Sequence, residues 1–270
     1  MFATDFEYDG HCLSDFGFII CNFNGSSDTE TISAGSRITF NTVSTHYGKR
    51  FGLAGTQYDE CITATFDICK DQCNGEDIVI TNDEYRDIMR WLNRREFLKF
   101  RILYDDDDLR EICYYDASFN IDKIMADQGL VGLTLTLETN KPFGYAQEQS
   151  FSWNVSHGST KKLYDMSDEI GYTYPSMVIT MRESGTLSIT NDIEPCTMII
   201  KNCTAGEIIT IDGDALIITS SMNSHKICDD FNFEFLRIGN TINDRTNRIT
   251  FSLACKVVIT FSPVIKDSPG

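Results

Sequence analysis

The sequence predicts a mainly β protein with two antiparallel domains and one confident α-helix, which lies in the first half. Three observations lead to this fold class. Apolar and polar residues alternate over most of the chain, turn signals such as Asp212-Gly213 separate the alternating runs, and apolar residues recur at helical spacing in one segment. Alternating strand and helix segments are absent, which argues against doubly wound and barrel enzyme folds.

The size and composition of the chain suit two folded domains. It has 270 residues, of which 41% are hydrophobic and 23% charged, and only 5 are proline. Because a domain usually contains about 100–200 residues, two ordinary domains are a better expectation than one large one. The composition is typical of a globular chain that buries a core, and it argues against disordered, collagenous and coiled-coil proteins.

The predicted strands each bury one face. The alternation is longest from Ile249 to Phe261, which we interpret as one long strand or as two strands joined by a bend. Three shorter runs show the same pattern: Ile62, Ala64, Phe66 and Ile68; Leu133, Leu135 and Leu137; and Phe231, Phe233 and Phe235.

The helix is predicted from Thr81 to about Arg95. Its apolar face comprises Tyr85, Ile88, Met89 and Leu92, and Thr81-Asn-Asp-Glu84 has the form of a capping box. Acidic residues in its first turn and Arg94 and Arg95 in its last turn suit the helix dipole. We expect it to cover one sheet face, with Trp91 and Phe97 adding apolar bulk.

The alternation stops between Asn140 and Trp153 and resumes afterwards, which places a domain boundary near Tyr145. The predicted domains are therefore residues 1–145 and 146–270. In the second, strands every eight to twelve residues without a strong helix are typical of a β-sandwich.

The charge of the chain argues against sequence-specific DNA binding. It contains 23 basic and 40 acidic residues, for a net charge of −17. Residues 1–145 hold 13 basic and 25 acidic residues, a net of −12, and residues 146–270 hold 10 and 15, a net of −5. Such a surface repels phosphates. The first residues lack the features of a secretory signal and no run of eighteen apolar residues occurs, so we expect no membrane anchor.

No motif in the sequence indicates a cofactor, a metal or a catalytic site. The nucleophile elbow, the P-loop, the dinucleotide fingerprint and the H-E-x-x-H motif are all missing. A catalytic triad assembled by the fold stays open, since its members need only meet in space. The 10 cysteines are scattered, so we interpret them as mostly reduced core residues, and Cys69 and Cys73 lack the second pair that a zinc site needs. The acidic run Asp105 to Asp108 is interpreted as a solvated hairpin tip.

The order of several segments resembles the distal tail protein of long, non-contractile-tailed bacteriophages, the hub of the tail tip. The similar segments cover most of the chain and are specific through their joint order: Tyr8–Gly10, Leu13–Ile20, Gly48–Leu53, Tyr58–Phe66, Ile88–Leu92, Tyr114–Phe119, Asn140–Tyr145, Tyr174–Ile179, Gly185–Asn191, Phe235–Asn240 and Arg248–Phe251.

The resemblance implies a structural protein of the virion that is assembled in the host cytoplasm and is not an enzyme. Its first domain would be a β-sandwich with a flanking helix and a long hairpin, and six copies would form a ring. The ring would join the tail tube protein to tail-tip and receptor-binding proteins and let DNA pass without specific binding. The second domain would be a galectin-like sandwich. The galectin sugar motif His-x-Asn-x-Arg is absent from residues 151–270, so the fold name does not support sugar binding.

The candidate subunit interface lies in the hairpin. Alternating runs at Arg37–Thr45 and Tyr58–Ile68 flank a glycine-rich connection, Gly48–Gly55. Exposed strand edges invite pairing with a neighbouring subunit, so we predict that this segment closes the ring. The interface residues selected are Lys49, Arg50, Phe51 and Leu53.

Two other classes of function remain open. One is a carbohydrate-binding adhesion module, for which 11 Tyr and 2 Trp leave room for an aromatic platform. The other is an enzyme whose His, Asp and Ser or Cys converge only in the folded structure. The acidity of the first domain likewise has two interpretations: a lining that keeps DNA from adhering to a channel, or a solvated outer surface.

Overall fold

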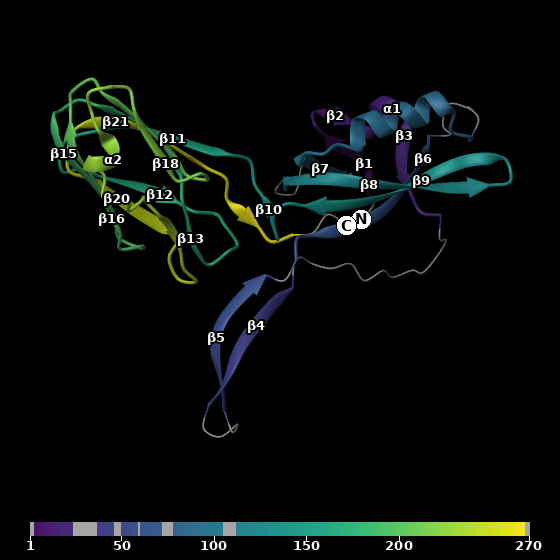
Figure 1. Ribbon diagram of the computed structural model, residues 1–270, viewed down its shortest axis with the longest axis horizontal. Helices are drawn as coiled ribbons and strands as arrows, with labels where there is room; N and C mark the ends of the chain where they lie inside the picture. The colour runs from purple at the N-terminus through teal and green to yellow at the C-terminus, as the bar shows by residue number, and fades with distance from the viewer. Residues whose placement is uncertain are drawn as a thin grey trace. The chain divides into compact units, whose positions relative to one another are not determined.

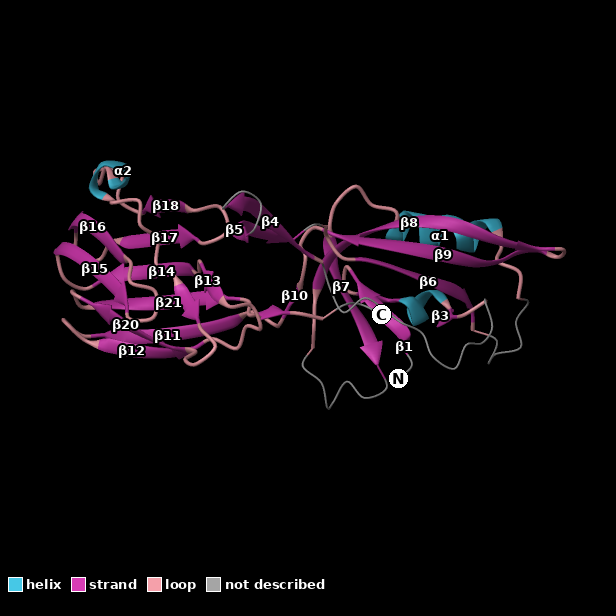
Figure 2. Cartoon of the chain, turned by 90° about the horizontal axis from the view of Figure 1, so that it is seen from below, coloured by secondary structure: helices cyan, strands magenta, loops and turns pink. Residues whose placement is uncertain are grey.

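The computed structural model describes residues 3–23, 37–45, 50–58, 60–71, 78–104 and 112–267. Strands dominate the described chain (Figure 2). It divides into two units, Met1–Ala146 together with Ile265–Gly270, and Gln147–Val264. The return of the last residues to the first unit is a feature that the sequence analysis did not anticipate.

One antiparallel sheet of seven strands forms the body of the first unit (Figure 1). The strand order is β2-β1-β7-β8-β9-β6-β3, and β1 contacts β3, so the sheet curls around its own core. The short strands β10 (Gly144–Tyr145) and β22 (Val264–Ile265) pair separately. The strands of the sheet are β1 (Ala3–Tyr8), β2 (His11–Cys12), β3 (Phe18–Cys21), β6 (Thr63–Lys70), β7 (Leu98–Tyr104), β8 (Tyr115–Ala126) and β9 (Gly129–Thr139).

The core of the first unit forms where the alternation predicts it. Leu133, Leu135 and Leu137 on β9 are fully buried, and Ile62 and Ile68 at β6 join the same cluster. Aromatic rings fill much of the space: Phe6 stacks on Trp91 with ring centroids 5.6 Å apart. A 3-10 turn, η1 (Leu13–Phe16), contributes the buried Leu13.

The predicted helix is present as α1 (Asn82–Leu92), with Ile88, Trp91 and Leu92 buried. Its capping box is confirmed: Glu84 N donates to Thr81 Oγ1 at 3.3 Å, and Thr81 N donates to Glu84 Oε2 at 2.7 Å. The predicted end at Arg95 is wrong, because the helix stops at Leu92 and both arginines follow it. The prediction that Phe97 adds apolar bulk under the helix is also wrong, since this side chain is 47% exposed.

The second unit is a sandwich of two antiparallel sheets. A five-stranded sheet, β11-β21-β14-β17-β18, faces a four-stranded one, β12-β20-β15-β16, and β13 pairs with β19. The elements are β11 (Gln149–Val155), β12 (Thr160–Tyr164), β13 (Gly171–Thr173), β14 (Ser176–Met181), β15 (Gly185–Asn191), β16 (Thr197–Cys203), β17 (Ile208–Asp212), β18 (Ile217–Ser220), α2 (Ile227–Asp230), β19 (Ile238–Asn240), β20 (Thr246–Phe251) and β21 (Cys255–Phe261).

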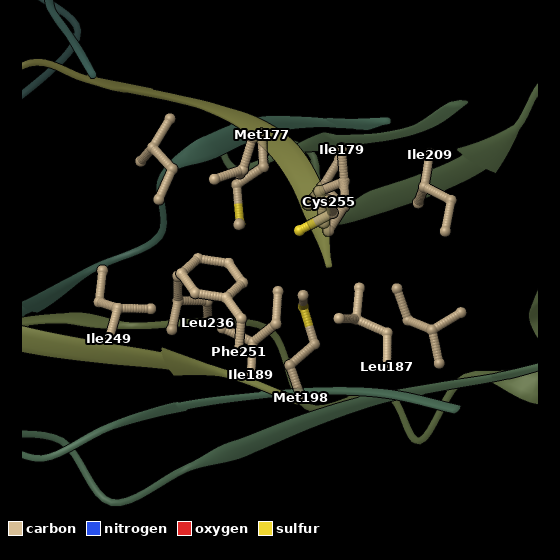
Figure 3. Packing of buried hydrophobic residues seen from close by; sticks show 14 of the residues in the cluster. Met177, Ile179, Leu187, Ile189, Met198, Ile209, Leu236, Ile249, Phe251 and Cys255 are labelled. Carbon is tan, nitrogen blue, oxygen red and sulfur yellow. The ribbon is translucent and has the colours of Figure 1, made fainter. Parts of the chain in front are cut away.

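The long alternating run from Ile249 to Phe261 forms two strands joined by a bend, one of the two predicted arrangements. β20 belongs to the four-stranded sheet and β21 to the five-stranded sheet. Their inward side chains meet in one core (Figure 3), where Phe251, Cys255 and Ile259 are fully buried. Because the chain crosses from one sheet to the other between β20 and β21, a single alternating run contributes buried side chains to the inner faces of both sheets.

The strand predicted through Phe231, Phe233 and Phe235 is wrong. Phe231 forms an isolated bridge with Ile200 and is buried, whereas Phe233 has a φ of 57° and is 68% exposed. A left-handed residue interrupts the extended backbone, so apolar alternation does not produce one buried face there.

Candidate functional site

The β4–β5 hairpin of the first unit stands apart from the seven-stranded sheet as a two-stranded sheet of its own (Figure 1). It consists of β4 (Ile38–Thr45) and β5 (Arg50–Tyr58). Among the described residues, no third strand pairs with either outer edge. Two unpaired edges are a template for strand addition by another chain.

The predicted connection needs a correction. The sequence predicts that the glycine-rich segment Gly48–Gly55 links two hairpin strands, but residues 50–55 are themselves part of β5. Most of the run predicted as the second hairpin strand, Tyr58–Ile68, instead forms β6, which lies in the main sheet between β9 and β3. Glycine is unfavourable inside strands but is common beside bulges. The β4–β5 pair has a bulge at this point, next to Gly55.

That bulge determines which side chains share a face. Asn41 pairs with Gly55 and Thr42 pairs with Leu53, so Ala54 is an extra residue in β5. Residues opposite each other in a ladder point to the same face, and an extra residue reverses the alternation beyond it. Phe51 and Leu53, opposite Ser44 and Thr42, therefore lie on the same face as Phe40 and Tyr58.

We call this face the arm face: Ile38 and Phe40 on β4, with Phe51, Leu53 and Tyr58 on β5. Four of these side chains are exposed despite being apolar: Ile38 by 47%, Phe40 by 63%, Phe51 by 73% and Leu53 by 63%. Tyr58 lies at the base, with its ring 6.0 Å from that of Phe143. Exposed apolar side chains gathered on one face are typical of surfaces that contact another molecule.

The structure brings together two of the four interface residues selected from sequence. Phe51 and Leu53 lie on the arm face, Arg50 begins β5, and Lys49 lies outside the described residues. Sequence reasoning missed Ile38 and Phe40, although their two-residue spacing was a usable signal. The spacing alone does not show that the two lie on one face with Leu53, because that depends on the bulge at Ala54.

The second unit contains one buried titratable cluster, built on Glu207. Its side chain is fully buried, and Oε1 accepts from Ser220 Oγ and from His225 Nδ1, both at 2.5 Å. Oε2 accepts from Thr204 N at 2.9 Å. Burial alone would raise the pKa of Glu207, but the hydrogen bonds from Ser220, His225 and Thr204 outweigh it and lower the pKa.

This cluster does not form the catalytic triad that the sequence left open. A triad requires a nucleophile hydrogen-bonded to the imidazole, whereas Ser220 and His225 both bind the same carboxylate. The other ring nitrogen of His225 faces Asp230 at 3.4 Å. The arrangement instead ties β18 and the segment of α2 to the turn before β17.

One exposed aromatic ring of the second unit, that of Tyr172, has a cation over one of its faces. Tyr172 is half exposed, but the guanidinium of Arg237 lies over its ring at 4.6 Å from the centroid. Tyr174 packs edge-on against Tyr172, 5.5 Å between centroids. A sugar stacks on a free ring face, and the cation occupies one face of Tyr172.

The described ranges contain no cluster of three or more His, Cys, Asp or Glu that could hold a metal ion. No helix in these ranges is long and apolar enough to span a bilayer. The acidic run Asp105 to Asp108 and Cys73 lie outside the described residues.

Comparison with known proteins identifies both units. A family model described as a phage tail protein N-terminal domain matches residues 1–141, and one described as a phage tail C-terminal domain matches residues 143–261. No curated protein matches the chain.

Two solved structures match nearly the full length of the chain. The first is the Dit protein of phage SPP1, described as a paradigm of the hub adsorption apparatus in phages that infect Gram-positive bacteria. It is 11% identical, with a TM-score of 0.65 over 96% of this chain and 98% of that chain. The second is the phage P2 baseplate in its activated conformation with Ca, 11% identical, with a TM-score of 0.48 over 96% and 98%. At 11% identity, the likeness to the SPP1 protein is one of fold.

Proposed function

The chain belongs to the phage tail protein family whose N-terminal and C-terminal domains it matches in order, and from this premise we propose that it is the hub ring of the tail tip. It is a component of the virion and a structural protein rather than an enzyme. In this proposal six copies form the ring, which joins the tail tube protein to tail-tip and receptor-binding proteins. Residues 1–145 form the ring, and residues 146–270 form a galectin-like domain that carries no catalytic function.

The observation that carries the proposal is the arm face. Its exposed apolar side chains find no partner strand within the described part of the chain. Burying the face against a neighbouring copy removes this apolar area from water, at about 25 cal/mol per Å². Repetition of one such contact around an axis closes a ring, because each copy offers both the arm and the surface that receives it.

Native mass spectrometry of the full-length protein tests the ring. Wild-type protein should give a hexamer mass, and the double variant Phe51→Ser, Leu53→Ser should give a folded monomer. Val43→Ser is the matched control, because Val43 is 55% exposed but pairs with Gly52 on the opposite face of the hairpin. Deletion of residues 49–54 should also leave a folded monomer. Rings of unchanged mass in the double variant would remove the arm face from the interface.

DNA passage is the second part of the proposal. The net charge of −12 on residues 1–145 supports an acidic channel lining. Basic side chains in the lining would bind phosphates with release of counterions, and this affinity would slow the duplex, whereas an acidic lining would not bind it. The competing interpretation is a solvated acidic exterior. A structure of the assembled ring separates them through the charge of the side chains that face the channel. A neutral or basic lining would reject the passage argument and leave the hub assignment intact.

A further inference from the structure

Two cysteines meet at the edge of the main sheet of the first unit. β3 pairs with β6, with Cys21 opposite Asp67 and Cys69 opposite Ile19. Cys21 and Cys69 are thus diagonal neighbours on one face of the pair. The other face carries Phe18 and Ile68, which are buried in the core, so the cysteines lie on the side away from that core.

The two thiols touch and are accessible. The side chains of Cys21 and Cys69 are hydrogen-bonded to each other. Both cysteines are free and only partly buried. By contrast, Cys203 and Cys255, which are close enough to interact electrostatically, are both buried in the core of the second unit. Cys21 and Cys69 therefore combine mutual contact with access to a small reagent.

We propose that Cys21 and Cys69 are a modification site, at which exchange with a small-molecule disulfide such as oxidised glutathione forms a reversible cross-strand disulfide. The virion provides the two conditions. The protein is made in a reducing cytoplasm and is then carried outside the cell, where disulfides persist. The proposal does not depend on the ring.

The exchange proceeds in two steps that balance. The Cys69 thiolate attacks one sulfur of the glutathione disulfide, which breaks its S–S bond, forms a mixed disulfide and releases one glutathione. The Cys21 thiolate then attacks the Cys69 sulfur, and the second glutathione leaves. The two protein thiols are oxidised, the glutathione disulfide is reduced, and the two thiol protons end on the two glutathione molecules.

The environment of Cys21 suits the second step. Burial first, and then the hydrogen bond to Cys69, raise the pKa of the Cys21 thiol, so it is a poor initial nucleophile. Once Cys69 carries glutathione, that hydrogen bond is lost while burial remains, and Cys21 reacts because the mixed disulfide is next to it in the same molecule.

The position in the sheet makes the bond reversible. A disulfide needs Cβ atoms about 3.8 Å apart, whereas diagonal neighbours on paired strands are farther apart. The end of β3 must therefore move toward β6, which is feasible because β3 is an edge strand and Cys21 is its last residue. A strained disulfide is more easily reduced. The bond would also close the loop of residues 22–68, which contains the β4–β5 hairpin.

The test uses the full-length protein and oxidised glutathione. After incubation, remaining thiols are alkylated in denaturant and the digested peptides are identified by mass spectrometry. We expect a peptide pair linking Cys21 to Cys69, lighter than its reduced parts by two hydrogen atoms. An excess of reduced glutathione should remove it. Cys61→Ser, which replaces another partly buried cysteine, is the control and should keep the linked pair.

The outcomes that overturn the proposal are distinct. A link from Cys69 to Cys73 would assign the reactive pair to the sequence neighbours. Glutathione attached to Cys69 with no linked peptide would show that β3 does not move far enough. Persistence of a link to Cys69 in the Cys21→Ser variant would also reject it.

Discussion

Glu207 is the buried residue whose loss should most weaken the second unit. Replacing it by alanine leaves three donors without their acceptor: Ser220 Oγ, His225 Nδ1 and Thr204 N. The His225 side chain is only 4% exposed, so water does not replace the carboxylate freely. Leaving a buried hydrogen-bonding group without its partner costs about 1–3 kcal/mol. That is a large fraction of the roughly 5–15 kcal/mol that stabilises a typical protein.

The matched control is the exposed Glu–His pair of the same unit. His157 Nδ1 lies 3.2 Å from Glu183 Oε2, with side chains 70% and 43% exposed. Solvent screens this pair, so Glu183→Ala should change stability little. Both variants remove a carboxylate from an imidazole nitrogen and from one backbone N–H, Thr204 N or Ala254 N, so the main differences are burial and the bond from Ser220.

The assay is denaturant unfolding followed through one tryptophan. The chain has 2 Trp, and Trp153 packs against the core of the second unit whereas Trp91 belongs to the first. In a Trp91→Phe background, Trp153 fluorescence reports the second unit alone. Equal midpoints for Glu207→Ala and Glu183→Ala would refute the reasoning.

The pH dependence of the same assay gives an independent check. The pKa of Glu207 is lowered from its usual 4.5 in the folded state, so its contribution is present above that pH and is lost as the pH falls through the folded pKa. Wild-type stability should therefore fall more steeply than that of Glu207→Gln below about pH 4.5. Parallel pH profiles would contradict the lowered pKa.

Three further changes test the fold. Thr81→Ala removes the acceptor for Glu84 N at the start of α1 and should cost about 1 kcal/mol in the Trp91-monitored transition; an unchanged midpoint would mean that the cap contributes nothing. Phe251→Asp places an unpaired charge in the core and should abolish the Trp153 transition, while Lys256→Asp, at an exposed position of β21, should retain it. Gly213→Ala should lower the melting temperature, because the added Cβ would lie 2.3 Å from Tyr174 O, whereas Gly55→Ala meets open space and should not.

Local chemistry explains the elements that were predicted well. The capping box at Thr81 and the alternation along β9 and β21 act through neighbouring residues, so the sequence alone indicates them. The Asp212-Gly213 hairpin was also expected, and β17 and β18 pair across it. Its glycine is needed for a reason that sequence does not reveal, the close approach of the Tyr174 carbonyl.

The errors arise where distant contacts override local pattern. The phenylalanines at 231, 233 and 235 alternate as a strand would, but a left-handed Phe233 separates them. The glycine-rich segment 48–55 has the composition of a loop, but most of it pairs with β4 as a strand. Pairing between strands far apart in the chain satisfies backbone groups that local propensity leaves undecided.

The amino-acid sequence by itself determined the mainly β class, the position of α1 and the absence of known catalytic motifs, since each depends on composition or on short spacing. Only the tertiary structure decided which strands pair, and with that the candidate site. The Ala54 bulge brings Phe51 and Leu53 onto one face with Ile38 and Phe40, because an extra residue in a ladder reverses the facing of every residue beyond it. The contacts of Glu207 and of Cys21 with Cys69 join residues that are far apart in the chain, and only folding places them together.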